Sequence, residues 1–209
     1  MSATSSRLVE LDVRLPVWGR FFTVAPLVLV GTCEADGSFD LAPKHMVLPL
    51  GWQNYFGFVC TPRHATYFNA WRERAFTVSY PRPGQLVETS LAASTRCEDG
   101  HKPAIATLAT VPARKVKGVL VEGATLQFEC ELDRIIDGFG ENSLVVGRIV
   151  AAYADPAALC EADRAPEDVL AEVRRVAGLP GGDPLSGSFY DQHRDGGVSH
   201  ARILQRFGT

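Results

Sequence analysis

The sequence predicts a mainly β protein, a closed antiparallel β-barrel with a few peripheral helices. Three observations support this prediction. Short apolar segments recur between turn residues, helical segments are few and short, and two long apolar segments flank a Gly-rich connection at residues 137–142. Many short strands separated by turns are typical of barrels and sandwiches. No GxGxxG motif follows a predicted strand, which argues against a Rossmann fold.

In the first half of the chain, turn signals divide the strands. Asp36-Gly37 is a hairpin signal, and Pro43 and Pro49 indicate an edge or bulged strand because proline cannot donate to a ladder. The expected elements are a strand at 24–33, an extended segment at 39–50, an aromatic strand at 54–60, a helix at 62–74 and a strand at 75–81.

The second half contains the clearest β signal. Apolar residues alternate with polar ones in the strand at 125–136, which predicts one buried face and one solvated face. A helix is expected at 83–95, a polar turn at 96–104, a second long strand at 143–154, a helix at 155–178 and a turn-rich tail at 179–209. We expect a single domain over residues 1–209, with the barrel core at 20–155 and the helical segment and tail at 156–209.

Composition excludes several classes of function. The chain has 209 residues, 46% of them hydrophobic and 22% charged, with a formal net charge of −3. This charge argues against a general nucleic-acid binder, which needs a basic surface. The sequence contains no run of about 18 apolar residues, so it predicts no membrane span. The first residues lack the apolar core of a signal peptide.

The five cysteines lie far apart, and no CxxC motif occurs. Cys33, Cys60 and Cys130 fall in apolar segments, where a free cysteine packs as a small hydrophobe. This pattern predicts a reducing, cytoplasmic location.

The stretch "TPRHATYFNAWRER" at 61–74 indicates an anion site. Thr61 is expected as the N-cap with Pro62 at the first helical position, so that the N–H groups of the first turn (Arg63, His64 and Ala65) point out of the helix start. A cation at a helix start is unfavourable unless it meets an anion. Thr66 and Asn69, one turn on, add donors. The alternative is a capped helix with a solvated Arg63 and an exposed Asn69.

The extended segment upstream adds candidate ligands. Its prolines leave backbone groups free to meet a planar heterocycle. Lys44 offers charge to a phosphate, and His45 can titrate near neutral pH or bond a ring. In the alternative interpretation His45 is structural, and the aromatic residues pack in the barrel rather than stack on a ligand: Trp52, Tyr55 and Phe56.

Several elements in this order resemble the flavin reductase-like family, whose fold is the FMN-binding split barrel, a Greek-key antiparallel barrel. They are an opening strand with a DG hairpin, an "AP" extended segment, "RxxTxxN" before an "FTV" strand, and a long hairpin with "EC" in one arm and "VVGRIV" in the other. The resemblance covers about residues 20–155.

The resemblance implies a homodimer with FMN, in preference to FAD, at the subunit interface. The residues beside the isoalloxazine ring would be Lys44, His45, Met46 and Val47. The residues around the phosphate would be Thr61, Arg63, His64, Ala65, Thr66 and Asn69. NAD(P)H would be a transient reductant, and a partner monooxygenase or another acceptor would take the electrons. The resemblance requires no catalytic side chain and no metal. His45 is the candidate to tune the ring, with His193 or His200 of the tail as further candidates.

The implied function is an NAD(P)H:flavin reductase or a flavoredoxin-like electron carrier. Lys44-His45-Met46 stands where family members often carry a small hydroxyl residue, and Glu141-Asn142 stands where many carry Asp-His. These departures bear on the nicotinamide-driven step rather than on flavin binding. The alternatives are a non-catalytic flavin- or phosphate-binding barrel and a pyridoxamine-phosphate oxidase-like FMN enzyme.

Overall fold

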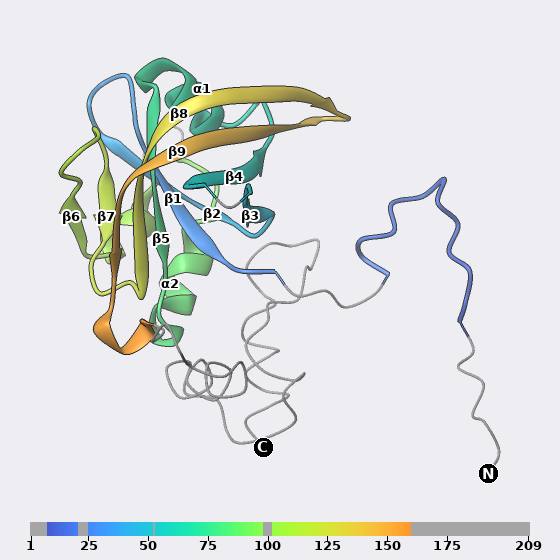
Figure 1. Ribbon diagram of the computed structural model, residues 1–209, viewed down its shortest axis with the longest axis horizontal. Helices are drawn as coiled ribbons and strands as arrows, with labels where there is room; N and C mark the ends of the chain where they lie inside the picture. The colour runs from blue at the N-terminus through green and yellow to red at the C-terminus, as the bar shows by residue number, and fades with distance from the viewer. Residues whose placement is uncertain (1–7, 21–24, 52, 98–101, 160–209) are drawn as a thin grey trace, which may run out of the picture.

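The structure, a computed structural model, describes residues 8–20, 25–51, 53–97 and 102–159. Within these residues a seven-stranded antiparallel sheet curls around the core in the order β2-β1-β5-β8-β9-β4-β3, with a small β6-β7 sheet beside it (Figure 1). Its strands are β1 (Val28–Cys33), β2 (Phe39–Lys44), β3 (Val47–Pro49), β4 (Tyr55–Cys60), β5 (Ala75–Tyr80), β8 (Leu126–Phe139) and β9 (Asn142–Ala154). The small sheet consists of β6 (Thr110–Pro112) and β7 (Val119–Val121). The prediction of a mainly β split barrel is confirmed.

The helices are short and peripheral. The α-helices are α1 (Ala65–Glu73) and α2 (Leu86–Leu91), and the 3-10 helices are η1 (Pro83–Gln85), η2 (Pro103–Thr107) and η3 (Pro156–Ala158). The helix predicted at 83–95 therefore ends early, and η2 begins inside the predicted polar turn. Of the helix predicted at 155–178, the described part is η3, capped by Asp155. The rest, with His193 and His200, lies outside the described residues.

The sheet is curled but not closed, which differs from the predicted closed barrel. β2 and β3 stand at its two ends, and they do not pair with each other in the part of the chain that the structure describes. Pro43 lies in β2 and Pro49 in β3. A proline has no backbone N–H to donate, so these strands are suited to edges. The edge-strand prediction is confirmed.

The β1-β2 hairpin forms as its turn residues predict. The Gly37 backbone has φ 89, the left-handed region that favours glycine, and its N–H donates to the Glu34 carbonyl. The Asp36 carboxylate accepts hydrogen bonds from the Ser38 N–H and hydroxyl. The turn fixes the register that pairs Val28 with Lys44, and so places the end of β2.

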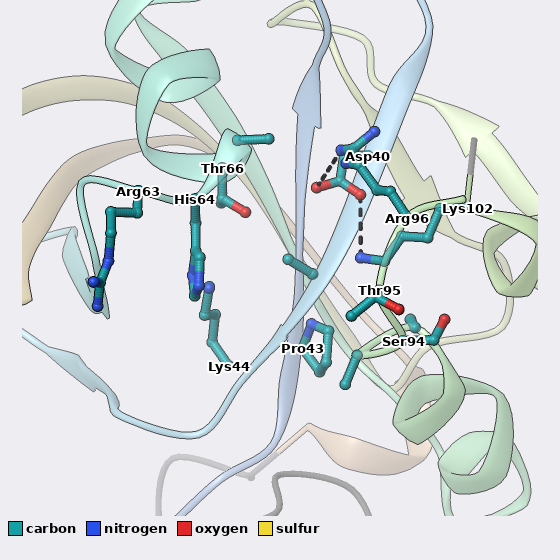
Figure 2. Close-up of a pocket in the computed structure, with 14 residues that line it drawn as sticks. Asp40, Pro43, Lys44, Arg63, His64, Thr66, Ser94, Thr95, Arg96 and Lys102 are labelled. Atoms are coloured by element: carbon teal, nitrogen blue, oxygen red, sulfur yellow. Dashed lines mark hydrogen bonds and ion pairs between the residues drawn. The ribbon is translucent and has the colours of Figure 1, made fainter. Parts of the chain in front are cut away.

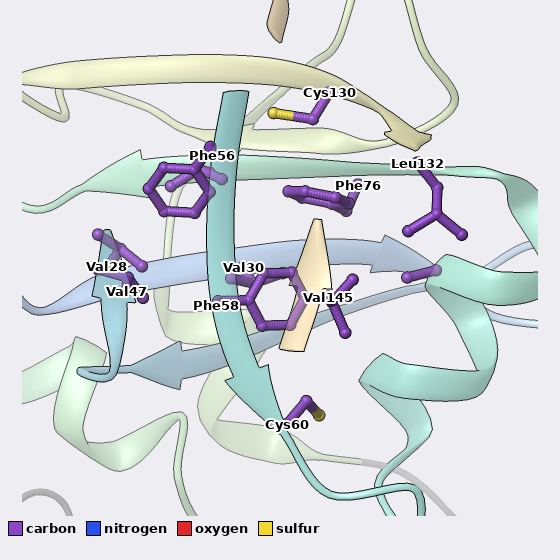
Figure 3. Packing of buried hydrophobic residues seen from close by; sticks show 12 residues of the cluster. Val28, Val30, Val47, Phe56, Phe58, Cys60, Phe76, Cys130, Leu132 and Val145 are labelled. Atoms are coloured by element: carbon purple, nitrogen blue, oxygen red, sulfur yellow. The ribbon is translucent and has the colours of Figure 1, made fainter. Parts of the chain in front are cut away.

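The main core lies inside the curl of the sheet (Figure 3). The rings of Phe58 and Phe76 pack edge to face with centroids 5.1 Å apart. The predicted apolar cysteines are free and buried in the structure: Cys33, Cys60 and Cys130. Phe56 is also buried in this core, which confirms its packing interpretation, while Tyr55 is half-buried and Trp52 lies outside the described residues.

The long β8-β9 hairpin corrects two details of the prediction. Its strands run on to Phe139 and from Asn142, so most of the predicted connection is strand, and its far end projects from the body of the sheet (Figure 1). The predicted alternation holds at Cys130 and Glu131, but Glu129 is fully buried rather than solvated. The loop between β6 and β7 covers Glu129 and donates backbone hydrogen bonds to its carboxylate.

Candidate functional site

A cavity of about 560 Å³ opens between the start of α1, the second half of β2 and the segment that follows α2 (Figure 2). Its lining residues are Asp40, Ala42, Pro43, Lys44, Arg63, His64, Ala65, Thr66, Ala92, Ala93, Ser94, Thr95, Arg96 and Lys102. Three separate parts of the chain therefore build it, and β2 forms its floor between the other two.

The α1 wall begins one turn later than the sequence predicts. The N-cap of α1 is His64, whose side chain makes no capping hydrogen bond, and not Thr61. The Thr61 hydroxyl accepts from the Arg63 N–H at 3.1 Å, and the Thr61 carbonyl accepts from the His64 N–H at 3.1 Å. A turn at 61–64 thus uses the groups expected to cap the helix, and the first helical N–H groups belong to Ala65 and Thr66.

Those N–H groups have no intrahelical acceptor, and they lie at the positive end of the helix dipole. Ala65 and Thr66 both line the cavity, and Thr66 is buried. The His64 side chain projects from the same helix start and lies beside the Lys44 side chain (Figure 2). This wall presents donors of the kind that hold phosphate groups.

Arg63 lies at the rim of this wall. Its guanidinium donates to the Glu141 carboxylate at 2.6 Å, and both side chains are exposed. Glu141 is in the turn of the β8-β9 hairpin. The ion pair therefore joins the far end of the hairpin to the loop before α1, and Arg63 also belongs to the cavity lining.

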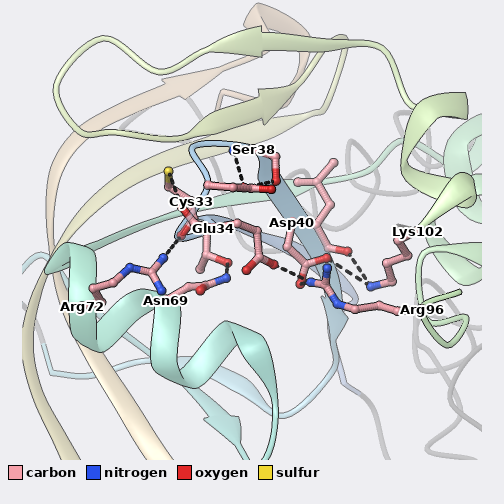
Figure 4. Close-up of polar contacts among 11 residues, drawn as sticks. Cys33, Glu34, Ser38, Asp40, Asn69, Arg72, Arg96 and Lys102 are labelled. Atoms are coloured by element: carbon pink, nitrogen blue, oxygen red, sulfur yellow. Dashed lines mark hydrogen bonds and ion pairs between the residues drawn. The ribbon is translucent and has the colours of Figure 1, made fainter. Parts of the chain in front are cut away.

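The opposite wall is organised by a buried carboxylate (Figure 4). Asp40 accepts from the Lys102 ammonium at 3.3 Å and lies 3.2 Å from the Arg96 guanidinium. Arg96 also pairs with Glu34, and Lys102 also donates to the Leu41 carbonyl at 3.2 Å. These contacts hold two cations against β2 at fixed positions in the cavity lining.

Among the charged side chains of the described lining, cations outnumber anions. The lining carries Lys44, Arg63, Arg96 and Lys102 against the carboxylate of Asp40. His64 is exposed at the cavity wall, but partial burial of its imidazole lowers its pKa below the usual value, and the charges of Lys44, Arg63 and Lys102 lower it further. Burial also lowers the pKa of Lys102, against the opposing effect of Asp40. Such a cavity attracts anions and disfavours further positive charge.

Five of the ten predicted site residues line this cavity: Lys44, Arg63, His64, Ala65 and Thr66. The other five lie nearby but outside the lining: His45, Met46, Val47, Thr61 and Asn69. Their flavin contacts stay predictions, and each has a defined place in the fold.

His45 is half-buried, and burial together with the Lys44 charge lowers its pKa. The Met46 carbonyl accepts from the Val59 N–H at 2.9 Å, and Val47 is packed in the main core. The buried Asn69 amide donates to the Thr32 hydroxyl at 3.2 Å, which ties α1 to β1.

Sequence reasoning missed one whole wall of the cavity. The segment at 92–96 was expected to be helix and polar turn, and Lys102 and Asp40 were not singled out. The sequence signal that could have indicated this wall was the pair of hydroxyl residues, Ser94 and Thr95, directly before Arg96. For Asp40 and Lys102 there was none, because their pairing joins positions 62 residues apart.

Among the residues with defined placement, no group of three His, Cys, Asp or Glu side chains is arranged to hold a metal ion. The described helices include none that is both long and apolar enough to cross a membrane.

The curled sheet, with a cationic cavity beside a helix start, defines a split-barrel protein. Three solved structures share the fold. An FMN-binding protein from Thermus thermophilus is 21% identical to this chain, with a TM-score of 0.63. The match covers 76% of this chain and 85% of that chain. The NADH:FAD oxidoreductase SgcE6 of Streptomyces globisporus C-1027 has 18% identity, coverage of 73% and 89%, and a TM-score of 0.62. A Shewanella frigidimarina protein described as having a split barrel domain has 18% identity, coverage of 71% and 75%, and a TM-score of 0.62.

The sequence then identifies the family within this class. The model of the flavin reductase like domain matches residues 19–166. The chain belongs to the flavin reductase-like family, as its sequence motifs predict. It is a flavin reductase-type oxidoreductase by family.

Proposed function

We propose that this protein is an FMN-binding oxidoreductase, acting as an NAD(P)H:flavin reductase or as a flavoredoxin-like electron carrier. The observation that carries the proposal is the cationic cavity at the start of α1, where Lys44, Arg63 and His64 meet the free N–H groups of the helix. Charge-assisted bonds from such groups suit a phosphate dianion. The family match supports flavin as the molecule that carries this phosphate.

The donor set of the cavity fits the phosphate of FMN. The N–H groups of Ala65 and Thr66 would hold the phosphate oxygens, and Lys44 and Arg63 would neutralise the phosphate charge. Lys102 and Arg96, held by Asp40, keep the opposite wall positive without being free to move far.

The flavin ring would lie toward the residues after Pro43. β2 is an edge strand, so the backbone groups on its outer side are not used by another strand of the described sheet. These groups can bond the edge of a planar heterocycle, with Lys44, His45 and Met46 beside it. Bound FMN would supply the redox chemistry, while the chain orients the ring and shields it from water.

We further propose a homodimer with flavin at the subunit interface, NAD(P)H as the reductant, and a monooxygenase or another acceptor as the recipient of electrons. Size-exclusion chromatography with light scattering of the full chain tests the dimer.

Two measurements test the function. Purified protein titrated with FMN should quench flavin fluorescence, and anaerobic NADH or NADPH should then bleach the flavin absorbance. Bleaching supports the oxidoreductase. Binding without bleaching by either nucleotide points to a non-catalytic flavin barrel or a pyridoxamine-phosphate oxidase-like enzyme. Tighter binding of FAD than of FMN would contradict the choice of cofactor.

The variant Arg63→Ala tests the phosphate site itself. Loss of one charge-assisted bond should weaken FMN binding by about 1.5–3 kcal/mol. Arg14→Ala is the control, because Arg14 is an exposed arginine in an ion pair with Asp12 and does not line the cavity. Unchanged FMN affinity in Arg63→Ala would place the phosphate elsewhere.

A further inference from the structure

His64 occupies an unusual electrostatic position in the cavity. It is the N-cap of α1, where the helix dipole is positive, and its imidazole is not used as a cap. It lines the cavity together with four charged groups that act on its imidazole: Lys44 and Asp40 of β2, Arg63 of the preceding turn, and Lys102 at the start of η2. Three of these four are cations, and cations disfavour a positive charge on the imidazole.

We propose that His64 is a protonatable phosphate ligand, so that the cavity takes up one proton when it binds the phosphate of flavin. The inference rests on the proposed function and adds to it a dependence of flavin affinity on pH.

The physical reason is a reversal of the local charge. A bound phosphate dianion offsets the cations around His64 and provides an acceptor for the imidazole N–H. Histidine has an ordinary pKa of about 6.5, so an anion in contact with the imidazole shifts its protonation into the neutral pH range. Before the dianion binds, partial burial and the nearby cations lower the pKa of His64 and so favour the neutral imidazole. Binding the dianion raises the pKa, and the imidazole gains a proton from solvent.

The dependence on pH follows from this linkage. Between pH 8 and pH 6.5, FMN affinity should increase as the pH falls, by up to about tenfold per unit for one linked proton. Below about pH 6 the second ionisation of the phosphate reverses, and affinity should fall again. Riboflavin lacks the phosphate and should bind with no such dependence.

The test uses the full-length protein and its His64→Asn variant. Asparagine is a favoured N-cap that does not titrate, so the helix start is retained. FMN affinity is measured by fluorescence quenching from pH 5.5 to pH 8. Proton uptake at pH 7 is measured by calorimetry in two buffers of different ionisation heat. The expected result is uptake near one proton for the wild type, near zero for His64→Asn, and near zero for riboflavin with either protein.

Two results overturn the inference alone: tight FMN binding whose affinity is flat from pH 6.5 to pH 8, or equal proton uptake in His64→Asn and wild type. Absence of FMN binding at every pH overturns the proposed function as well. Circular dichroism of the variant checks that its fold is intact.

Discussion

The Lys102 ammonium lies 3.3 Å from an Asp40 carboxylate oxygen, and both side chains are almost completely buried at the cavity wall. The pair joins β2 to the start of η2 across 62 residues of sequence. Arg96 shares the same carboxylate. Asp40 is therefore the residue that holds one wall of the candidate flavin site in place.

Replacing Asp40 should destabilise the protein. Asp40→Ala leaves the buried Lys102 ammonium without its carboxylate and leaves Arg96 with Glu34 as its carboxylate partner, which should lower the free energy of unfolding by about 3 kcal/mol. Urea unfolding followed by circular dichroism measures it. The control is Asp12→Ala, since Asp12 forms an exposed pair with Arg14 and should leave the urea midpoint unchanged. Equal midpoints for the two variants would contradict a structural role for Asp40.

Gly147 should not tolerate a side chain. A Cβ at this position of β9 would lie 2.4 Å from the Phe76 ring, which the core holds in place. Gly147→Ala should therefore cost about 2 kcal/mol of stability through overpacking. Gly84→Ala is the matched control, because a Cβ there meets nothing within 4 Å. Thermal unfolding of both variants compares them, and a Gly147→Ala protein as stable as Gly84→Ala would refute the packing argument.

Glu129 should contribute stability that disappears in acid. Burial raises its pKa, but hydrogen bonds from the Arg114 and Lys115 N–H groups and the Tyr153 hydroxyl outweigh that effect, and the net pKa is lowered. A carboxyl whose pKa is lower in the folded state stabilises it above the unfolded pKa, and this contribution is lost as the pH falls through the folded pKa.

Glu129→Gln should thus cost about 2 kcal/mol at pH 7 and lose less stability than wild type on acidification below about pH 4.5. Urea unfolding at pH 7 and at several acidic pH values measures both effects. Glu131→Gln, on the same strand but exposed and paired with Arg148, serves as the control. An unchanged acid dependence in Glu129→Gln would show that other groups dominate it.

Glu141 should weaken flavin binding through its ion pair with Arg63. In Glu141→Gln the guanidinium loses its carboxylate partner and becomes available to the phosphate. We expect FMN to bind up to about fivefold more tightly, because exposed ion pairs contribute little free energy. The same substitution in an Arg63→Ala background should have no effect. A gain that persists without Arg63 would mean that Glu141 acts by another route.

Local signals in the sequence predicted much of the sheet. The Asp36-Gly37 turn, the prolines of the two edge strands and the alternation around Cys130 each correspond to the structure, because turn geometry and strand period are properties of neighbouring residues. The predicted start of α1 was wrong by one turn, because the Thr61 groups form a turn instead of a cap. Glu129 was misassigned to solvent because the β6-β7 loop that covers it comes from elsewhere in the sequence.

The sequence by itself determined the β character of the chain, its hairpins and the gathering of Arg63, His64 and Thr66 at a helix start, since each depends on residues a few positions apart. Only the tertiary structure decided that Arg96 and Lys102 meet these residues around one cavity, with Asp40 between the two cations. The reason is that strand order and the curl of the sheet bring β2, α1 and η2 together, and burial then forces their charges to pair.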